Sequence, residues 1–239
     1  MLYLIGLGLN EKGISKSGLE LAKRCKKIYL EIYTVDFPYA YSEITELIGK
    51  KISLADRSFI ESLKIIDEAK KTDIALLIYG NPLMATTHIA LIQEAKRSRV
   101  KYRIIHNASI LDGIAETGLQ AYKFGKTASI PAWKKNYEPT SFIKTIKENL
   151  SIGAHTLLLV DIGLDFKDCL RELKEAAKRE RMQIGKIITC QCIGTPRSKI
   201  FYRHIQNFGE DEWLKKPYCL IIPAKLHFVE EEFLKDFEE

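Results

Sequence analysis

Short apolar segments separated by longer amphipathic ones are the feature that most limits what this chain can fold into. Residues 2–7 and 74–79 are apolar almost throughout, and each segment stops at a glycine, Gly8 and Gly80. This pattern is typical of strands that are buried on both faces. Residues 15–26 place apolar side chains on one face only, as a surface helix does. The alternation predicts an α/β fold with a mostly parallel sheet and helices on both of its faces.

The other elements of the first half follow from residue types and capping signals. Residues 28–34 are rich in β-branched and aromatic residues, as strands are. Ser58 and Glu61 have the spacing of a capping box and predict a helix over 58–71. We also expect a strand at 102–105, a helix over 86–97 with Thr86 as its N-cap, and a short helix capped by Ser109.

The pattern changes near Gly118, after which strands lie closer together with fewer helices between them. This predicts a second α/β domain with a mixed sheet. We place the domains at 1–110 and 111–239. The expected strands are 127–130, 156–162, 186–193, 199–204 and 218–222, and the expected helices are 141–150, 165–181 and 230–239.

Composition excludes several classes of protein. There are 37 Lys and Arg against 31 Asp and Glu, a net charge of +6, and this dispersed excess does not predict a direct nucleic-acid partner. No apolar run approaches the ~20 residues of a membrane span, and the first residues do not resemble a signal peptide. Five scattered cysteines without a CxxC pair indicate reduced thiols in a cytoplasmic protein without a metal site: Cys25, Cys169, Cys190, Cys192 and Cys219.

Glycines mark the end of the first strand, in the segment Gly6-Leu7-Gly8-Leu9. Glycines at a strand end let a ligand approach the backbone closely, and ligands of open α/β sheets collect beyond the carboxyl ends of strands. The dinucleotide-binding pattern GxGxxG needs a glycine where this chain has Glu11. A plain turn and a ligand-binding turn therefore both remain open for this motif.

Two further strand ends carry small and polar residues. Residues 80–88, GNPLMATTH, form a Gly-Pro turn that could hold a polar small molecule through its backbone, although a simple strand-to-helix connection fits equally well. Residues 106–110, HNASI, follow another strand, where His106 could act as a base or serve only as a structural hydrogen-bonding group. A basic stretch over 96–103, like the one over 174–186, is explained by a solvated surface or by docking of an acidic partner.

No nucleophile elbow, phosphate-binding loop or zinc motif is present, so no catalytic residue can be assigned. Methyl transfer from a sulfonium needs neither a metal nor a covalent intermediate. It needs close, in-line approach in a desolvated pocket, which backbone and apolar side chains can build. The three strand-end motifs suit such a site.

The motifs together resemble the diphthine synthases, methyltransferases of the tetrapyrrole methylase type. The matching segments occur in family order: MLYLIGLGL at 1–9, GNPLMATTH at 80–88, YRIIHNASI at 102–110, GLQAYKFGKTASI at 118–130, HTLLLVDI at 155–162 and LIIPAKLH at 220–227. HNASI, the YKFG stretch and Trp133 are more similar to the eukaryotic branch than to the archaeal one.

The resemblance implies two α/β domains with S-adenosylmethionine in the cleft between them, and a homodimer. It implies an enzyme that successively methylates the modified histidine of translation elongation factor 2 in diphthamide biosynthesis. Carried over position by position, the cofactor contacts would be Leu9, Asn81, Met84, Ser109, Ile110, Val160, Ile193 and Tyr218.

This chain departs from the family pattern at two of those positions. Asn81 stands where the family usually has Asp, which keeps a carbonyl acceptor but loses a negative charge, and Tyr218 stands where archaeal relatives often have His. The chain is also shorter than the family pattern leads one to expect. Two alternatives therefore remain: a methyltransferase of tetrapyrrole precursors or other small molecules with the same fold, and a degenerate module that binds the factor without catalysis.

Overall fold

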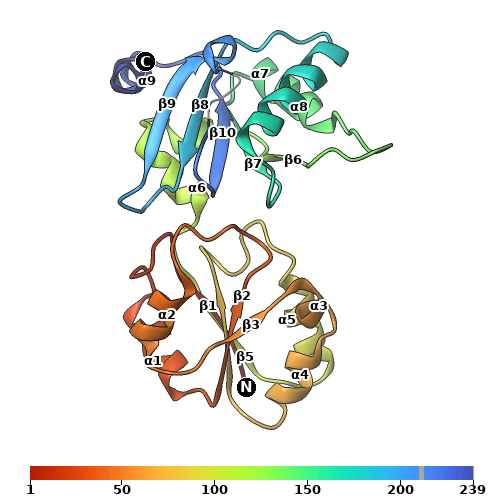
Figure 1. Cartoon of the computed structure of the whole chain (residues 1–239), viewed down its shortest axis with the longest axis vertical. Coiled ribbons are helices and arrows are strands. Elements are labelled where there is room, and N and C mark those ends of the chain that lie inside the picture. Colours follow the sequence, from red (N-terminus) through yellow and green to blue (C-terminus); the bar gives the residue numbers. More distant parts are fainter. Residues whose placement is uncertain (210–212, 239) are drawn as a thin grey trace. The chain divides into compact units, whose positions relative to one another are not determined.

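The computed structural model describes residues 1–209 and 213–238. The chain forms two compact units, Met1–Gly113 and Ile114–Glu239 (Figure 1). Each unit contains one sheet of five strands.

The first unit is a parallel sheet with strand order β3-β2-β4-β1-β5. Its strands are β1 (Leu2–Gly6), β2 (Lys27–Glu31), β3 (Ser53–Ala55), β4 (Ile74–Ile78) and β5 (Tyr102–Ile105). All five residues of β4 are buried, because helices cover both faces of the sheet. The predicted parallel sheet is confirmed.

Helices on opposite faces of this sheet close two apolar cores (Figure 1). One face packs against α1 (Lys16–Arg24) and α2 (Tyr41–Ile48), through buried Ala22, Ile44 and Ile48. The other face packs against α3 (Arg57–Glu61), α4 (Lys64–Ala69) and α5 (Ile89–Arg97), through side chains such as Ile66 and Leu91. A last short helix, α6 (Ile110–Gly113), ends the unit.

Three details of this unit differ from the sequence-based expectations. The single helix expected over 58–71 is two helices, because Leu63 between them adopts a positive φ of 59°. Its cap is Asp56, whose carboxylate accepts the Phe59 N–H at 2.7 Å, and not Ser58. Helix α5 starts at Ile89 and not at Thr86, because the Thr86 hydroxyl donates to the Pro82 carbonyl oxygen and holds a turn there.

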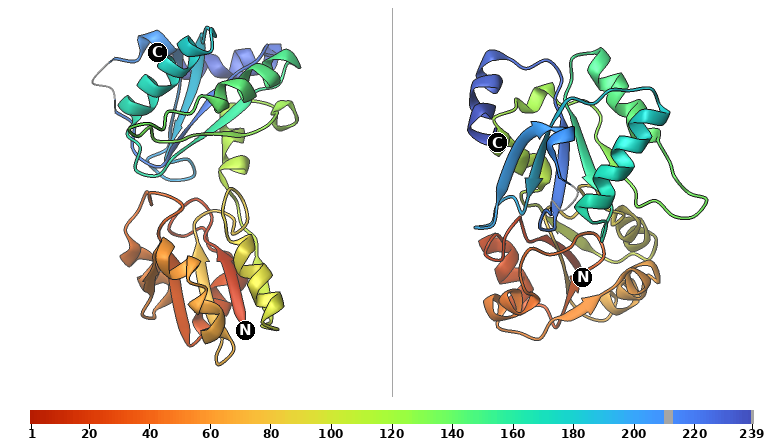
Figure 2. Two further views of the ribbon diagram at one scale, coloured as in Figure 1. Left: turned by 90° about the vertical axis from the view of Figure 1, so that its right-hand side faces the viewer. Right: turned by 45° about the horizontal axis from the view of Figure 1, so that its top comes forward.

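The second unit contains a mixed sheet, as predicted, and its strand order is β6-β7-β10-β8-β9. Figure 2 shows the ribbon of this unit in two further views. Strands β6 (Ala128–Ile130) and β7 (Thr156–Val160) are parallel. Strands β8 (Lys186–Gln191), β9 (Lys199–His204) and β10 (Tyr218–Ile222) join antiparallel to their neighbours. Helices α7 (Ser141–Ser151) and α8 (Phe166–Arg179) bury Phe142, Phe166 and Leu173 in one core with this sheet.

The C-terminal helix α9 (Phe228–Leu234) is held to the second unit by a buried carboxylate. Glu230 is fully buried and accepts hydrogen bonds from the backbone N–H groups of Gln120, at 2.9 Å, and His227, at 2.8 Å. It also pairs with the ammonium of Lys123 and lies 3.2 Å from Nε2 of His155. This network joins the helix to residues 120–123 and to the start of β7.

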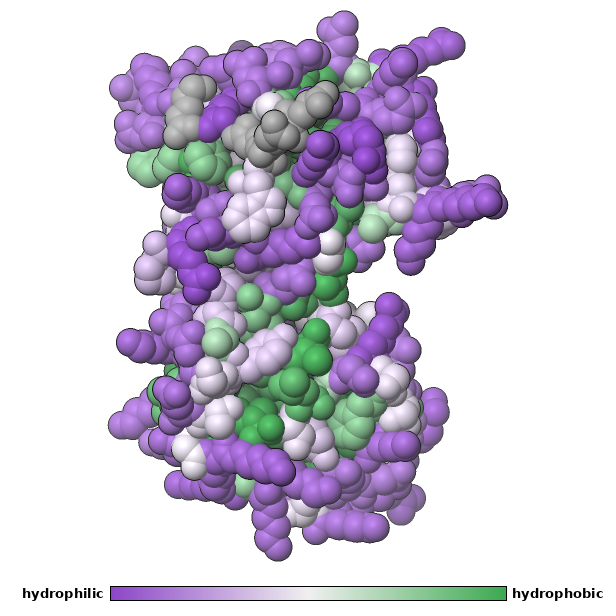
Figure 3. All heavy atoms as spheres, viewed as in Figure 1, coloured by the Kyte–Doolittle hydropathy of each residue, from purple (hydrophilic) through white to green (hydrophobic). Residues whose placement is uncertain are grey.

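No helix within residues 1–209 and 213–238 is long and apolar enough to cross a membrane. In Figure 3 hydrophilic residues cover much of the visible face of each unit.

Candidate functional site

Three neighbouring strands of the first unit end at the same edge of the sheet. Strand β1 lies between β4 and β5 and is parallel to both, so their carboxyl ends are adjacent. The loops that follow these strands are the three motifs singled out in the sequence. We call this region the strand-end site, defined by residues 6–9, 80–84 and 106–110. Its position matches the general rule for ligand sites in open α/β sheets.

Backbone hydrogen bonds join the first two loops directly. Leu7 N–H donates to the Ile78 carbonyl at 2.8 Å, and Gly8 and Gly80 exchange two bonds at 3.2 and 3.0 Å. Gly8 and Gly80 have φ values of +74° and +69°, which other residues adopt only with strain. Glycine is therefore required here for the two loops to meet.

The backbones approach so closely at Gly6 that no side chain fits. A Cβ added at Gly6 would lie 2.6 Å from the Gly80 carbonyl oxygen and 2.9 Å from Cβ of Asn107. All three loops therefore touch at this glycine, and the strand-end site is a preformed cradle of backbone atoms.

Asn107 fixes the third loop to the first. Its Nδ2 donates to the carbonyl oxygens of Gly6, at 3.0 Å, and Gly13, at 2.9 Å. Its Oδ1 accepts the Ala108 N–H at 2.8 Å. One amide side chain thus bonds three backbone groups, those of Gly6, Gly13 and Ala108.

Asn81, a predicted cofactor contact, joins the second loop to the third. Its Nδ2 donates to the Asn107 carbonyl at 3.0 Å, and its Oδ1 accepts the Leu83 N–H at 3.3 Å. Nδ1 of His106 lies 3.3 Å from Nδ2 of Asn81. Nδ2 of Asn81 thus donates to a carbonyl oxygen. A carboxylate at this position could not make this bond, because it has no hydrogen to donate.

The other predicted contacts of the first unit also belong to these loops. Leu9 is buried next to the loop junction, and its carbonyl accepts the Tyr79 hydroxyl at 3.0 Å. Met84 is 42% exposed, so its side chain is accessible to a ligand. Ser109 caps α6 as predicted: its Oγ accepts the Leu111 N–H at 3.2 Å. Ile110 is the first residue of that helix.

The predicted contacts of the second unit occupy strand ends too. Val160 is the last residue of β7 and is partly buried. Ile193 lies just beyond β8, between Cys192 and Gly194, which both have positive φ, and is 3% exposed. Tyr218 starts β10 and is buried, and its hydroxyl donates to the Leu164 carbonyl at 3.0 Å. The Tyr218 side chain belongs to the apolar core with Phe166.

The sequence did not reveal that the buried side chain of His88 supports the second loop. His88 is fully buried, and its Nδ1 lies 3.1 Å from the Pro82 carbonyl oxygen. A carbonyl only accepts, so Nδ1 carries the proton and Nε2 is a bare acceptor, which has no hydrogen-bond partner. Burial lowers the pKa of His88, partly offset by its bond to Pro82. The histidine ends the GNPLMATTH motif, but nothing in the sequence marks it as buried.

A second support comes from the strand next to β4. Glu31 ends β2 and is fully buried, and its carboxylate accepts the Thr34 N–H at 2.7 Å and the Thr34 hydroxyl. The turn it holds carries Tyr33, whose hydroxyl lies 3.2 Å from Oγ1 of Thr87. The Tyr33 ring also meets the His88 ring edge-on, with centroids 6.1 Å apart. The loop over 80–88 is therefore supported on two sides.

Polar side chains of the strand-end site are thus used mainly to hold its own loops. No group of three or more His, Cys, Asp or Glu side chains within the described residues could bind a metal ion. The site offers backbone groups, apolar side chains and neutral amides, which suit a small organic molecule better than a metal ion.

Comparison with known proteins identifies the class of this protein. Residues 1–205 match the family model for Tetrapyrrole (Corrin/Porphyrin) Methylases. The chain therefore has the fold of a methyltransferase of the tetrapyrrole methylase class.

The most similar relatives narrow the class. The chain is 39% identical to the diphthine synthase of Methanocaldococcus jannaschii over 98% of each chain. It is 48% identical to the diphthine methyl ester synthase of Schizosaccharomyces pombe over 68% of this chain, and the aligned part spans 58% of that protein, less than two thirds of its length. A solved structure assigned as a diphthine synthase, from Entamoeba histolytica, superposes with a TM-score of 0.92 at 31% identity and covers 100% of this chain and 98% of that one. The chain belongs to the diphthine synthase family, and the resemblance predicted from its motifs is confirmed.

Proposed function

We propose that this enzyme transfers methyl groups from S-adenosylmethionine to the modified histidine of translation elongation factor 2, in successive steps of diphthamide biosynthesis. The observation that carries the proposal is the strand-end site, a preformed backbone cradle in a chain of the diphthine synthase family. The names of its relatives favour this reaction over methylation of a tetrapyrrole precursor.

The residues of the first unit fit this methyl donor. The donor has an aromatic base with a flat face, polar hydroxyls and an amino acid end, and the site offers both apolar and polar partners. Leu9, Met84 and Ile110 supply apolar surface, and the loops over 80–84 and 106–110 supply backbone donors and acceptors. Asn81 and Ser109 hold those loops, so we assign them mainly a positioning role. The contacts proposed in the second unit remain Val160, Ile193 and Tyr218.

The donor, when bound, supplies a sulfonium methyl group that a lone pair can attack. The acceptor nitrogen forms a bond to the methyl carbon while the carbon–sulfur bond breaks and its electron pair stays on sulfur, which leaves S-adenosylhomocysteine. An amine must lose its proton to solvent before attack, whereas a carboxylate is already ionised at neutral pH. The chain's own contribution is a rigid, largely uncharged site that holds the reactants in line and excludes water.

A transfer assay tests the reaction directly. Purified enzyme is incubated with labelled S-adenosylmethionine and elongation factor 2 that carries the unmethylated histidine modification. We expect label in the factor, and mass spectrometry of the modified peptide then counts the methyl groups and detects any ester. Absence of label from the factor, with a correctly folded enzyme, would contradict the proposal.

A matched pair of variants ties the reaction to the strand-end site. Asn107→Ala removes bonds that join its loops, whereas Asn149→Ala removes an equivalent set in the second unit, to Lys126 and Thr156. We expect calorimetry with S-adenosylhomocysteine to show affinity lowered roughly tenfold or more by Asn107→Ala, since loss of about 1.4 kcal/mol of preorganisation is tenfold in affinity. Equal losses of affinity in both variants would indicate a general loss of stability and not a local site.

We also propose that the enzyme is a cytoplasmic homodimer. The cytoplasmic assignment follows from its proposed substrate, a translation factor, and from five cysteines that are all free and buried. Light scattering after size-exclusion chromatography tests the dimer, and a monomer at assay concentrations would contradict it.

A further inference from the structure

A projecting loop of the second unit is held rigidly although its tip is exposed. This arm, residues 131–140, follows β6 and extends away from the sheet (Figure 1). Its tip is a tight turn in which Lys134 and Tyr137 exchange backbone hydrogen bonds at 3.0 and 2.8 Å, with Asn136 at a φ of +68°. Lys134, Lys135 and Tyr137 are all exposed.

Trp133 anchors the base of the arm to helix α8. Its backbone N–H donates at 3.1 Å to the carboxylate of Glu172, which is 2% exposed, and its indole Nε1 donates to the Pro139 carbonyl at 3.3 Å. The guanidinium of Arg179 lies 4.7 Å from the centre of the indole ring. The arm is therefore fixed before any partner binds, which lowers the entropic cost of binding.

Helix α8 presents a row of cations beside the arm. Lys167, Arg171, Lys174 and Lys178 are spaced by four, three and four residues, so they lie on one face of the helix, and all four are exposed. Among the ion pairs of the described residues, only Arg171 of this row has a partner, Asp168 at 2.6 Å. The row was visible in the sequence, but the proposed methyl transfer gives it no role.

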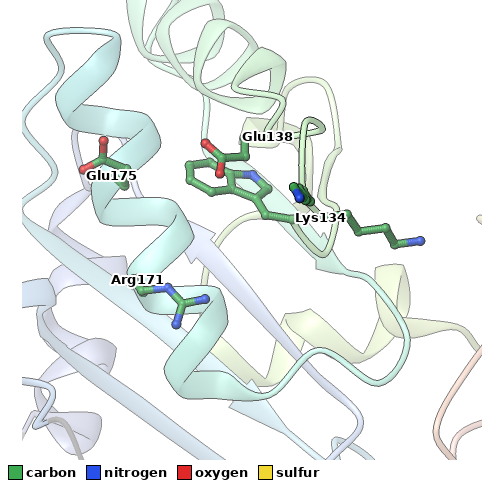
Figure 4. A pocket seen from close by; sticks show the side chains of 6 residues that line it. Lys134, Glu138, Arg171 and Glu175 are labelled. Carbon is green, nitrogen blue, oxygen red and sulfur yellow. The ribbon is translucent and has the colours of Figure 1, made fainter.

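A pocket of about 460 Å³ lies between the arm and the helix. Figure 4 shows it between α8, which carries Arg171 and Glu175, and the arm, which carries Lys134 and Glu138. Both glutamates are already paired with Arg179, at 2.7 and 3.0 Å. In Figure 3 the arm is strongly hydrophilic. The cations that remain for a partner are Lys134, Lys135, Lys167, Lys174 and Lys178, none of which has an ion-pair partner in the part of the chain that the structure describes.

We propose that the arm and the exposed face of α8 form the docking surface for an acidic segment of the protein substrate, a surface separate from the strand-end site. The inference rests on the proposed function, because it needs a protein as methyl acceptor. Carboxylates of the substrate pair with the unpaired lysines, while the exposed Tyr137 offers apolar contact at the arm's tip.

The observations favour a protein segment over nucleic acid. The carboxylates of Asp168, Glu138 and Glu175 are interspersed with the lysines, and a continuous phosphate backbone would meet their repulsion. The Trp133 ring, which could stack on a base, is covered by Arg179. A protein segment, by contrast, can place its carboxylates next to the lysines and keep them away from these acidic residues.

The test reverses charge on this surface and on a matched surface elsewhere. One variant carries Lys134→Glu, Lys135→Glu, Lys174→Glu and Lys178→Glu. The control carries Lys51→Glu, Lys71→Glu, Lys96→Glu and Lys101→Glu, an equal charge change at exposed residues of the first unit, which includes part of the basic stretch over 96–103. Both are compared with the wild-type enzyme in methyl transfer to unmethylated elongation factor 2, over a range of salt concentrations.

We expect the docking variant to raise KM for the protein substrate about tenfold or more, because unlike charges speed encounter and like charges suppress it. Its kcat and its affinity for S-adenosylhomocysteine should stay unchanged, and its KM should lose the salt dependence of the wild type. The control should raise KM by less than about twofold, since it leaves every lysine of the proposed docking surface in place.

Three outcomes would overturn the inference directly: an unchanged KM of the docking variant, an equal rise in KM in both variants, or a change in oligomeric state of the docking variant alone. A fourth would assign the surface to nucleic acid: the wild type binds a short single-stranded RNA, and the docking variant loses that binding while its KM for the protein substrate is unchanged. Calorimetric titration of the unmethylated factor into each protein measures docking without turnover. If wild-type enzyme binds the factor but transfers no methyl group, the proposed function fails and the docking result still stands on its own.

Discussion

The two units use the same kind of asparagine–glycine contact, and the surroundings of the two contacts differ. In each unit a single asparagine bonds two other segments of the chain beside a glycine that has no room for a side chain. Asn107 does so next to Gly6, and Asn149 bonds Lys126 and Thr156 next to Gly125, where an added Cβ would lie 2.2 Å from Oδ1 of Asn149. Tight asparagine–glycine contacts are therefore not by themselves a sign of function.

What differs is the position in the sheet and the charge of the neighbours. Asn107 lies at the carboxyl ends of parallel strands, and the partners of its side chain are neutral backbone groups. Asn149 bonds the first residue of β7, beside the buried network of Glu230, Lys123 and His155. The first arrangement leaves backbone groups for a ligand at a neutral edge, whereas the second uses its polar groups to hold the unit together.

Glu230→Ala should produce the largest loss of unfolding free energy, because it disrupts the buried network of the second unit. It removes the carboxylate that accepts four donors and leaves the Lys123 ammonium without its ion pair. We expect urea unfolding to show a loss of about 3–5 kcal/mol. Glu148→Ala, which breaks an exposed pair with Lys126, should cost less than about 1 kcal/mol.

The same network has a pH signature. Burial raises the pKa of Glu230, but its hydrogen bonds to His227, Lys123, Gln120 and His155 outweigh burial and lower it to about 2. A carboxylate whose folded pKa is depressed contributes stability above its unfolded pKa of 4.5, and this contribution is lost as pH falls toward 2. If the wild type and Glu230→Ala lost stability equally between pH 4.5 and 2, the network would not be the source.

Gly6→Ala should produce the next largest loss, because it disrupts the contacts among the three loops of the strand-end site. The new Cβ would meet the Gly80 carbonyl oxygen at 2.6 Å, Cβ of Asn107 at 2.9 Å and Cδ of Pro82 at 3.0 Å, none of which is the far end of a flexible side chain. We expect a loss of about 2–3 kcal/mol in unfolding free energy and loss of S-adenosylhomocysteine binding. Gly185→Ala, where an added Cβ meets nothing within 4 Å, should change neither the unfolding free energy nor the binding of S-adenosylhomocysteine. A similar loss in that variant would show that the close contacts at Gly6 are not the cause.

Most of the fold could be predicted from the sequence, because its strongest signals are buried strands. The parallel sheet of the first unit and the mixed sheet of the second follow from runs such as Ile74–Ile78 and from the spacing of strands after Gly118. Helix α2 and strand β3 were missed. Strand β3 is three residues long at the edge of its sheet, and two of those residues are exposed, so its pattern is weak.

The loops of the site could be predicted, but the bonds that shape them could not. The glycine and small polar residues after β1, β4 and β5 indicated a ligand site. That Asn107 joins Gly6 to Gly13, or that His88 is buried below Pro82, depends on contacts between residues far apart in the chain. A single sequence records residue types and local spacing, and these long-range contacts leave no periodic signal.

His88→Phe sharpens the comparison of the two units at a buried histidine. His155 has partners for both ring nitrogens, Ala224 N–H at 2.9 Å and Glu230, whereas His88 bonds only the Pro82 carbonyl. Removing that bond should cost about 1–1.5 kcal/mol at neutral pH. Because the pKa of His88 is lowered in the folded protein, the unfolded chain binds more protons below pH 6.5 than the folded protein does. The free energy of unfolding therefore falls as the pH decreases below 6.5. Urea unfolding from pH 7.5 to 5 should show a shallower fall in the variant than in the wild type, and an identical slope would contradict the assignment.

Asn81→Asp should have the smallest effect and introduces the residue that the family pattern leads us to expect at that position. An aspartate would place a carboxylate oxygen against the Asn107 carbonyl, where Asn81 now donates at 3.0 Å. Losing this bond should cost about 0.5–1 kcal/mol and should lower affinity for S-adenosylhomocysteine several-fold, because the second and third loops separate. Asn136→Asp makes the same chemical change on the exposed arm and should alter neither quantity. If Asn81→Asp instead raised the affinity, the negative charge at this position would act on the ligand itself, and Asn81 would be a direct contact and not a joint between loops.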